Sequence, residues 1–305
     1  MKSTQTDNNH TSKEQSLGAT ARRSGASSRH TKGRSVIPGR GLTMGVTITM
    51  LSLLILIPLA SILTYSFRLS FSEFIELITR QNVVRAFRTS ISCALIAALI
   101  NSVFGLILAW VLVRYDFPGK RLMDAMIELP FALPTAVAGI TLSKMYSDKG
   151  LIGQFFAKYG ISISYTKIGL TIALVFIGIP FVVRALQPVI EKLSPSWEEA
   201  AATLGASPAY TFRRVILPEL TPALLTGFGL ALARGIGEYG SVIYISGNSE
   251  KNGTQVVSYV IMQKLNSGSA DYEGAAAIAL VLLIISFLLL FFINMVQLAA
   301  GRRAS

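Results

Sequence analysis

Residues 194–218 read SPSWEEAAATLGASPAYTFRRVILP. Ser194 can cap the N-terminus of a helix in which Pro195 takes the first position. Glu198 and Glu199 follow in the first turn, where the positive end of the helix dipole stabilises negative charge. The alanines that come next continue the helix. The segment therefore opens with a short helix that is too polar to lie inside a membrane.

A glycine divides this segment into two parts. Gly205 can adopt the left-handed backbone conformation that ends many helices. Ser207 and Pro208 then repeat the start signal, and we expect the second helix to run to Pro218. The pattern predicts a helical hairpin outside the membrane. A plain amphipathic connector between two spans would show the same pattern.

The composition of the whole chain is that of a membrane protein. Hydrophobic residues make up 51% of the 305 residues and charged residues only 14%, against roughly 25% charged residues in soluble domains. The net charge of +12 then indicates basic ends on an all-α integral membrane protein, rather than a nucleic-acid partner. The two histidines, His10 and His30, lie in a polar stretch, and Cys93 is the single cysteine. We therefore expect no catalytic residue and no metal site, and an enzyme is disfavoured.

Six apolar stretches are long enough, at about 20 residues each, to cross a membrane as helices. Three of them contain no charge, and three contain prolines or charges, which must face protein or water rather than lipid. The six expected spans are 41–67, 89–113, 122–143, 168–189, 220–247 and 274–301. They predict one six-span membrane domain over residues 41–303, with its interior built from the third, fourth and fifth spans.

Residues 1–40 form a basic tail with eight Lys or Arg and two acidic residues. Its polar composition predicts disorder. Six spans place both termini on one side, and that side carries 17 basic residues against 10 on the other. Because basic residues favour the cytoplasm, we expect cytoplasmic termini and a tail held near anionic membrane lipid. The tail decides this orientation, and its composition is also that of an organelle transit peptide.

The spacing in residues 194–218 resembles the EAA loop of ABC importer permeases, EAA-x3-G-x9-I-x-LP, with Val215 in the place of the usual Ile. In that family the loop is the coupling element that docks into a groove on the ATPase subunit. The resemblance implies a cytoplasmic loop whose contacts with the ATPase include Glu199, Ala200, Ala201, Gly205, Leu217 and Pro218. Stabilisation of the helix dipole is a sufficient alternative role for Glu199.

Three stretches narrow the resemblance to the T subunit of sulfate/thiosulfate permeases. They are ELPFALPTAVAG at 128–139, IPFVVR at 179–184 and RGIGEYG at 234–240. The resemblance implies the type I ABC importer permease fold and a subunit of an ATP-driven sulfate/thiosulfate importer in the cell inner membrane, with the plastid envelope as an alternative. Molybdate permeases share the loop and a related Gly-Glu-aromatic-Gly stretch, and they are the nearest alternative family.

The chain contains no GxxxxGK[ST] phosphate-binding loop, so ATP has to be bound by another polypeptide. We expect no cofactor in this chain. The resemblance implies three protein partners: an ABC ATPase subunit, a second homologous permease subunit in a heterodimer, and a periplasmic sulfate-binding protein. An ATP-independent secondary transporter would explain the spans but would leave the loop without a purpose.

Two charges inside the fifth expected span are candidates for the translocation path. Arg234 is the basic residue deepest inside a span, and Glu238 lies four positions later, on the same face of a helix. Arg234 can line or gate the path, or the two can form a structural pair. Gly237 allows close backbone approach. Pro130 and Pro134 free backbone groups at membrane depth, as in the broken helices of transporters, or simply kink the helix.

Two acidic residues occur near the start of the third expected span, namely Asp124 and Glu128. Because they would repel an anion, we expect them to pair with nearby basic residues instead. The candidate partners are Arg114, Lys120 and Arg121.

Overall fold

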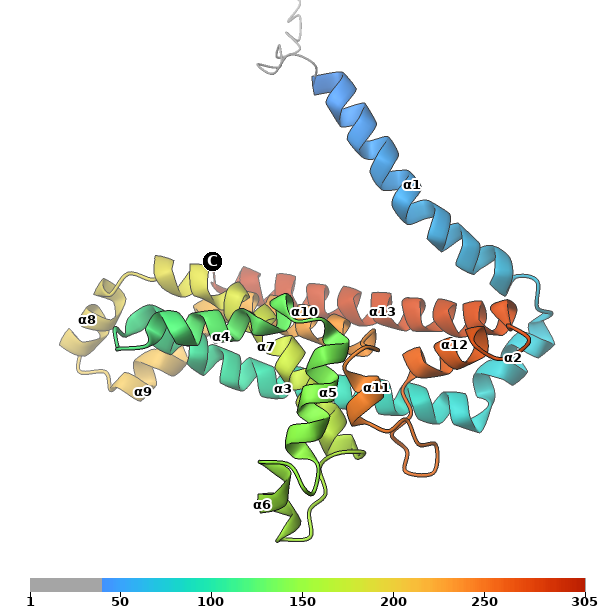
Figure 1. Cartoon of the computed structure of the whole chain (residues 1–305). Coiled ribbons are helices and arrows are strands. Elements are labelled where there is room, and N and C mark those ends of the chain that lie inside the picture. Colours follow the sequence, from blue (N-terminus) through green and yellow to red (C-terminus); the bar gives the residue numbers. More distant parts are fainter. Residues whose placement is uncertain (1–39, 305) are drawn as a thin grey trace, which may run out of the picture. The chain divides into compact units, whose positions relative to one another are not determined.

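The computed structural model describes residues 40–304. Within these residues the structure consists of helices and connecting turns and contains no strand (Figure 1), which confirms the expected all-α class. The basic tail predicted over residues 1–40 lies outside the described part, apart from Arg40, where the first helix begins. The chain divides into two units, residues 1–54 and 55–305. The packing described below is that of the second unit.

The helices follow one another along the chain with short connections. Their bounds are α1 Arg40–Ser66, α2 Phe71–Thr79, α3 Gln81–Arg114, α4 Lys120–Ala132, α5 Thr135–Tyr146, α6 Gly153–Ala157, α7 Lys167–Lys192, α8 Ser196–Thr203, α9 Pro208–Thr211, the π-helical turn η1 Phe212–Ile216, α10 Leu217–Ile236, α11 Val242–Ile245, α12 Val257–Leu265 and α13 Tyr272–Ala304.

Among the described residues, five helices are long and apolar enough to cross a membrane. They are α1, α3, α7, α13 and the continuous helix Pro208–Ile236, which joins α9, η1 and α10. The bent pair α4 and α5 becomes a sixth if it is one span. These five helices and the bent pair lie at the six stretches of sequence expected to span the membrane, but two of the six differ in form.

The third expected span, 122–143, is broken into α4 and α5, whose axes differ by 114°. The break comes at Leu133, which has an extended backbone with φ −89° and ψ 135°. Pro134 follows it directly and is the reason, because a proline disfavours the helical conformation of the residue before it. The other proline, Pro130, stays inside α4.

The fifth expected span, 220–247, ends at Ile236, about ten residues early, and α11 is a separate short helix. Gly237 and Gly240 interrupt it, because glycine is a poor helix former. Gly240 is also needed where it lies, since a Cβ there would be 2.1 Å from Oγ1 of Thr135. The chain therefore leaves the helix at Gly237 and passes close to the start of α5.

Small residues hold α3, α7 and α10 closely together. A Cβ on Gly105 of α3 would lie 2.7 Å from Cγ1 of Val182 in α7, and one on Gly227 of α10 would lie 2.7 Å from the Cα of Val182. Such close backbone approach is typical of helix packing in membranes. α13 lies beside α10, where Gly229 meets Ile293.

The bundle has two distinct ends (Figure 1). α8 and α9 lie at one end, and α2 and α12 at the other. Gly253, in the turn before α12, lies near the side chain of Lys167 at the start of α7. α7 has 26 residues, which at 1.5 Å per residue separates its ends by about 39 Å. The 194–218 segment is thus far from the 246–256 loop.

Candidate functional site

The 194–218 segment begins with α8. The helix starts at Ser196, one residue later than expected, and Pro195 at its N-cap makes no side-chain hydrogen bond. The Oγ of Ser194 instead accepts a bond from the backbone N–H of Ser196 at 3.3 Å. The expected cap by Ser194 on a helix starting at Pro195 is therefore wrong by one residue. Glu198 and Glu199 do lie in the first turn.

The turn predicted at Gly205 is present and well defined. Gly205 has φ +78°, the left-handed region in which glycine carries no steric penalty. Its N–H donates to the carbonyl of Ala202 at 2.9 Å, and the N–H of Ala206 donates to that of Ala201 at 3.0 Å. These two bonds are the Schellman pattern, which satisfies the last carbonyls of a helix. These two bonds fix the direction in which the chain leaves α8.

The second helix of the segment does not end at Pro218, as expected from the sequence. Ser207 caps it by accepting from the N–H of Tyr210 at 3.4 Å, with Pro208 in the first position. It then continues through η1 into α10 as far as Ile236. The wider π-helical turn accommodates the missing N–H of Pro218. The segment is consequently continuous with a membrane-spanning helix, so the two can move together.

Arg114 ties this segment to the rest of the bundle. Its Nη2 forms an ion pair with Glu198 at 3.1 Å and donates to the carbonyl of Leu193 at 3.3 Å. Its guanidinium also lies over the ring of Trp110, 5.2 Å from the centroid. The C-terminal ends of α3 and α7 and the start of α8 therefore share one cation. Sequence reasoning missed this pair because it assigned Arg114 to other acidic residues.

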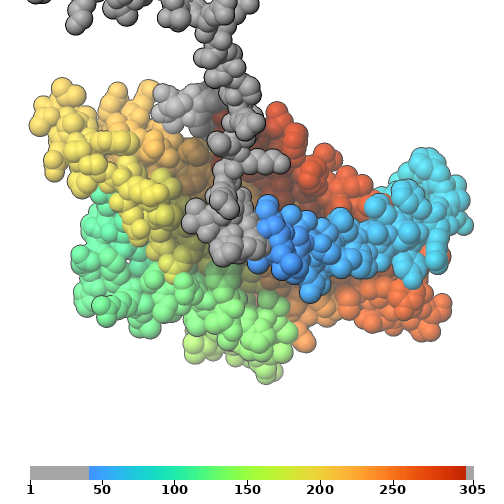
Figure 2. Space-filling model, turned by 90° about the horizontal axis from the view of Figure 1, so that it is seen from above, coloured from blue at the N-terminus to red at the C-terminus, as the bar shows by residue number. Residues whose placement is uncertain are grey.

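The outer side of the segment is open (Figure 2). Glu199, Ala200 and Gly205 are exposed, as is Leu204, with 87% of its surface accessible. A rigid surface that combines a carboxylate with an exposed leucine is suited to docking another protein. Of the remaining motif positions, Pro218 is exposed, and those half-buried are Ala201 and Leu217.

Arg234 and Glu238 contact each other through Nη1 and Oε2. Glu238 lies beyond the end of α10, so the pair is not on one helix face as expected. The Glu238 side chain is buried, and its Oε1 accepts from the N–H and Oγ of Ser241 at 2.8 and 3.0 Å. Its carbonyl accepts from Oγ of Ser258 at 2.7 Å. Both carboxylate oxygens are thus bonded, whereas the Arg234 side chain is 35% exposed.

The two breaks in the third and fifth expected spans lie against each other. Thr135, the first residue of α5, meets Gly240. One turn later, Gly139 packs so tightly on Ser241 that a Cβ would lie 2.3 Å from the Ser241 carbonyl oxygen. Ser241 is also the residue that donates to Glu238. The irregular backbone therefore connects the start of α5 to the buried carboxylate.

The other predicted path residues occupy different surroundings. Pro130 is buried inside α4, whereas Pro134 is exposed at the N-cap of α5. Gly237 is exposed at the C-cap of α10. Thr135 and Gly139, after Pro134, contact Gly240 and Ser241, after Gly237. Pro130 lies in α4, on the other side of the bend.

Asp124 and Glu128 pair with Arg184 of α7, not with the three basic residues expected. Arg184 donates to Asp124 at 3.0 Å, to Glu128 at 2.5 Å and to the side-chain oxygen of Gln187 at 2.6 Å. The bend at Pro134 leaves α4 beside the C-terminal half of α7, which places these groups together. Arg184 interrupts an apolar stretch of sequence, and that was the available signal for a charged partner on another helix.

A polar pocket of about 490 Å³ lies beside this cluster, and residues of α3, α4 and α7 line it together with Asp116. Asp116, between α3 and α4, accepts from Nζ of Lys120 at 2.8 Å. This hydrogen bond holds the pKa of Asp116 below its usual value. The pocket lining includes three basic and three acidic side chains, so its charge is balanced: Lys120, Arg121, Arg184, Asp116, Asp124 and Glu191.

The family described as "Binding-protein-dependent transport system inner membrane component" matches residues 101–304. The chain belongs to this family. It is therefore a multi-span membrane protein and the permease component of an ABC transport system. The sequence similarities extend over most of the chain.

"Sulfate transport system permease protein CysT" of Salmonella typhimurium is 46% identical over 270 residues, which cover 88% of this chain and 96% of that protein. The protein of the same name from Escherichia coli has the same identity and coverage. These relatives confirm the resemblance carried by residues 128–139, 179–184 and 234–240.

A solved structure supports the fold. A chain of a bacterial ABC transporter involved in the import of the acidic polysaccharide alginate superimposes with a TM-score of 0.69 at 16% identity, covering 85% of this chain and 95% of that chain. At this identity the likeness concerns the fold alone, and it confirms the expected ABC importer permease fold.

Proposed function

We propose that this chain is a permease subunit of an ATP-driven importer that carries sulfate and thiosulfate across the cell inner membrane. The observation that supports this most is the 46% identity to sulfate transport system permeases over 88% of the chain. The ends of the stretches 128–139 and 234–240 lie where the start of α5 meets the chain after α10, and together with 179–184 these stretches favour sulfate over molybdate permeases in the sequence.

In this proposal the 194–218 segment is cytoplasmic and docks on a separate ATPase subunit. Two features favour docking: the exposed Glu199 and Ala200 and the fixed turn at Gly205. Because the segment runs on into α10 without a break, a displacement of the docked helix is transmitted directly to the helix that carries Arg234. ATP binds to the partner, and this chain carries neither a cofactor nor a catalytic residue.

The translocation path in this proposal passes the half-exposed face of Arg234. Sulfate is a dianion, and its passage through a low-dielectric core needs a compensating charge or donors. Glu238 holds Arg234 in place and is itself fixed by Ser241. An arriving dianion competes with Glu238 for the open side of the guanidinium. Gly237 and Pro134 would serve by keeping the backbone irregular at this depth.

Three further partners complete the importer in this proposal. A second, homologous permease subunit supplies the other half of the path, the ATPase supplies the energy, and a periplasmic sulfate-binding protein supplies most of the affinity. Both termini of this chain are cytoplasmic, and the 1–40 tail lies near anionic lipid.

Labelled sulfate uptake in a host that lacks this gene tests the substrate. We expect the deletion to abolish uptake, the intact gene to restore it, and excess unlabelled thiosulfate to compete. Excess molybdate should not compete. Unchanged sulfate uptake together with lost molybdate uptake would contradict the proposal and assign the chain to molybdate.

A further inference from the structure

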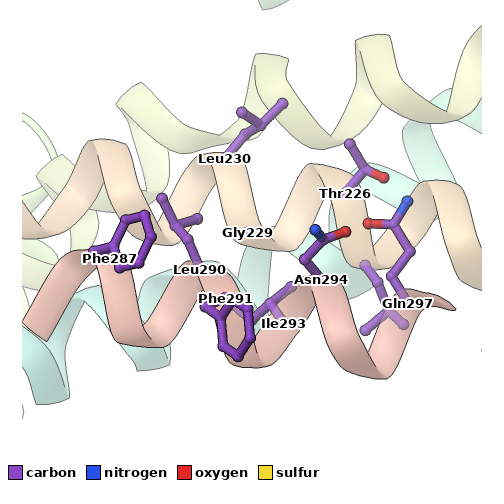
Figure 3. Close-up of a pocket in the computed structure, with 10 residues that line it drawn as sticks. Thr226, Gly229, Leu230, Phe287, Leu290, Phe291, Ile293, Asn294 and Gln297 are labelled. Carbon is purple, nitrogen blue, oxygen red and sulfur yellow. The ribbon is translucent and has the colours of Figure 1, made fainter. Parts of the chain in front are cut away.

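α10 and α13 leave an open groove between them, shown in Figure 3. Its volume is about 460 Å³, within the roughly 300–1,000 Å³ that small-molecule sites occupy. The helices meet closely where Gly229 touches Ile293. Side chains of both helices on either side of that contact line the groove. It lies on two membrane-spanning helices, and none of its lining residues belongs to the 194–218 segment or to the Arg234–Glu238 pair.

The polarity of the groove changes along its length. One end is lined by Leu230, Phe287 and Phe291, and the exposed fractions of the two phenylalanines are 67% and 55%. The other end presents the side-chain amides of Asn294 and Gln297 (Figure 3). A ligand that fits both ends must itself have an apolar part and a hydrogen-bonding part.

The amide end lies near the membrane surface. α13 carries no charge from residue 274 to residue 301, and Arg302 and Arg303 follow. At 1.5 Å per residue, Gln297 lies about 7.5 Å and Asn294 about 12 Å before Arg302 along the helix axis. Since the interfacial layer on each side of the hydrocarbon is roughly 5–8 Å thick, arginines at the outer edge of that layer place Gln297 at the level of the lipid ester groups and Asn294 about one helical turn deeper, at the edge of the hydrocarbon.

No hydrogen bond joins either amide to another side chain or backbone group within residues 41–299. Thr226, which also lines this end, already donates to the carbonyl of Pro222 at 2.9 Å. Amide groups at the edge of the hydrocarbon are costly without a partner. A helix from another subunit could satisfy them only with a polar side chain at the matching depth. The ester carbonyls of a phospholipid lie at this depth in any membrane.

We propose that this groove binds a glycerophospholipid. One acyl chain lies along Leu230, Phe287 and Phe291, and the N–H groups of Asn294 and Gln297 donate to ester carbonyl oxygens. The lipid fills the space that α10 and α13 leave open and joins the two helices on their outer side. The proposal depends on the chain spanning a membrane and not on the identity of the transported anion.

Retention of phospholipid by the full-length chain, purified with the subunits that accompany it, tests the proposal. The complex is delipidated, reloaded from vesicles of phosphatidylethanolamine and phosphatidylglycerol, and analysed by native mass spectrometry. Two variants change opposite ends of the groove. The double variant Asn294→Leu with Gln297→Leu removes the hydrogen-bond donors, and Leu290→Trp fills the apolar part, which Leu290 lines. Leu288→Trp is the matched control, since Leu288 is exposed on the same helix but does not line the groove.

We expect a phospholipid retained on the native chain and on the Leu288→Trp control, and about tenfold less on both groove variants. Equal retention on all forms, or equal loss in the control, would overturn the proposal. A second arm identifies the occupant in native membranes. A benzophenone is attached to the cysteine of an Asn294→Cys variant; the natural Cys93 is buried and should not react. We expect the benzophenone to form adducts with phospholipid. An adduct with another polypeptide would show that a protein helix occupies the groove and would overturn the proposal.

Discussion

Arg114 at the end of α3 forms an ion pair with Glu198 in the first turn of α8, with 3.1 Å between Nη2 and Oε1. The neighbouring Glu199 is exposed. Two adjacent glutamates thus have different tasks: Glu198 attaches the 194–218 segment to the bundle, and Glu199 is left for a partner.

A double-mutant cycle on Arg114→Gln and Glu198→Gln measures this attachment. Because Glu198 is partly exposed, solvent screens the pair, and we expect a coupling free energy of about 0.5 kcal/mol in thermal unfolding of the purified protein. The exchange Arg114→Glu with Glu198→Arg should recover part of the uptake lost in either single exchange. A coupling free energy of zero would mean that the ion pair does not hold α8.

The cost of replacing Gly205 should depend on how readily the new residue adopts a positive φ. A Cβ at Gly205 would meet nothing within 4 Å, yet its φ is +78°. Gly205→Val should therefore cost about 1–2 kcal/mol and misdirect the turn, whereas Gly205→Asn, a residue that visits this conformation, should cost less. Thermal unfolding and uptake of both variants check this. Equal effects of valine and asparagine would show that side-chain contact, and not φ, decides.

Arg234→Gln should lower sulfate uptake by more than about tenfold. The single exchange also leaves the buried Glu238 carboxylate without its cation, which is destabilising. The double exchange Arg234→Gln with Glu238→Gln removes both charges, so we expect thermal stability to recover while uptake stays low. If uptake returned together with stability in the double variant, the pair would be structural only.

Asp271 is expected to stabilise the start of α13 in a pH-dependent way. Its carboxylate accepts from Nζ of Lys264 at 2.6 Å and from the N–H of Gly274 at 2.7 Å, and the bond from Lys264 is the main reason that the pKa of Asp271 is lowered. A lowered folded-state pKa gives stability that is present above the unfolded value, about 3.9, and is lost as the pH falls through the folded value.

Thermal unfolding of the native chain and of Asp271→Asn, measured between pH 7 and pH 3, tests this. The difference should stay constant from about pH 7 to pH 5 and shrink below about pH 4, and it should be under about 1 kcal/mol because Asp271 is partly exposed. Asp271→Ala should lose about 1 kcal/mol more through the missing helix cap. A difference that grows on acidification would contradict the sign of the pKa shift.

Local signals in the sequence were sufficient for the hairpin. The cap at Ser207 and the left-handed turn at Gly205 depend on a few neighbouring residues, and both are present. The end of the second helix was not predictable in this way, because Pro218 stops a helix in isolation but is accommodated by the preceding π-helical turn.

Contacts between distant segments were beyond sequence reasoning. Asp124 and Glu128 lie near several basic residues in sequence, yet Arg184 binds them from 60 and 56 positions away. The choice depends on the direction of α4 after the bend at Pro134. The meeting of Gly240 with Thr135 depends on the same bend, so one proline determines both contacts.

The most direct test of the central claim is labelled sulfate uptake by Glu199→Lys in a host that lacks this gene. Glu250→Lys serves as the matched control, because Glu250 is an exposed glutamate in the 246–256 loop, at the opposite end of the bundle. We predict that Glu250→Lys restores uptake and that Glu199→Lys does not, although both proteins reach the membrane in equal amounts. Full uptake by Glu199→Lys would contradict the claim that the 194–218 segment couples this permease to its ATPase.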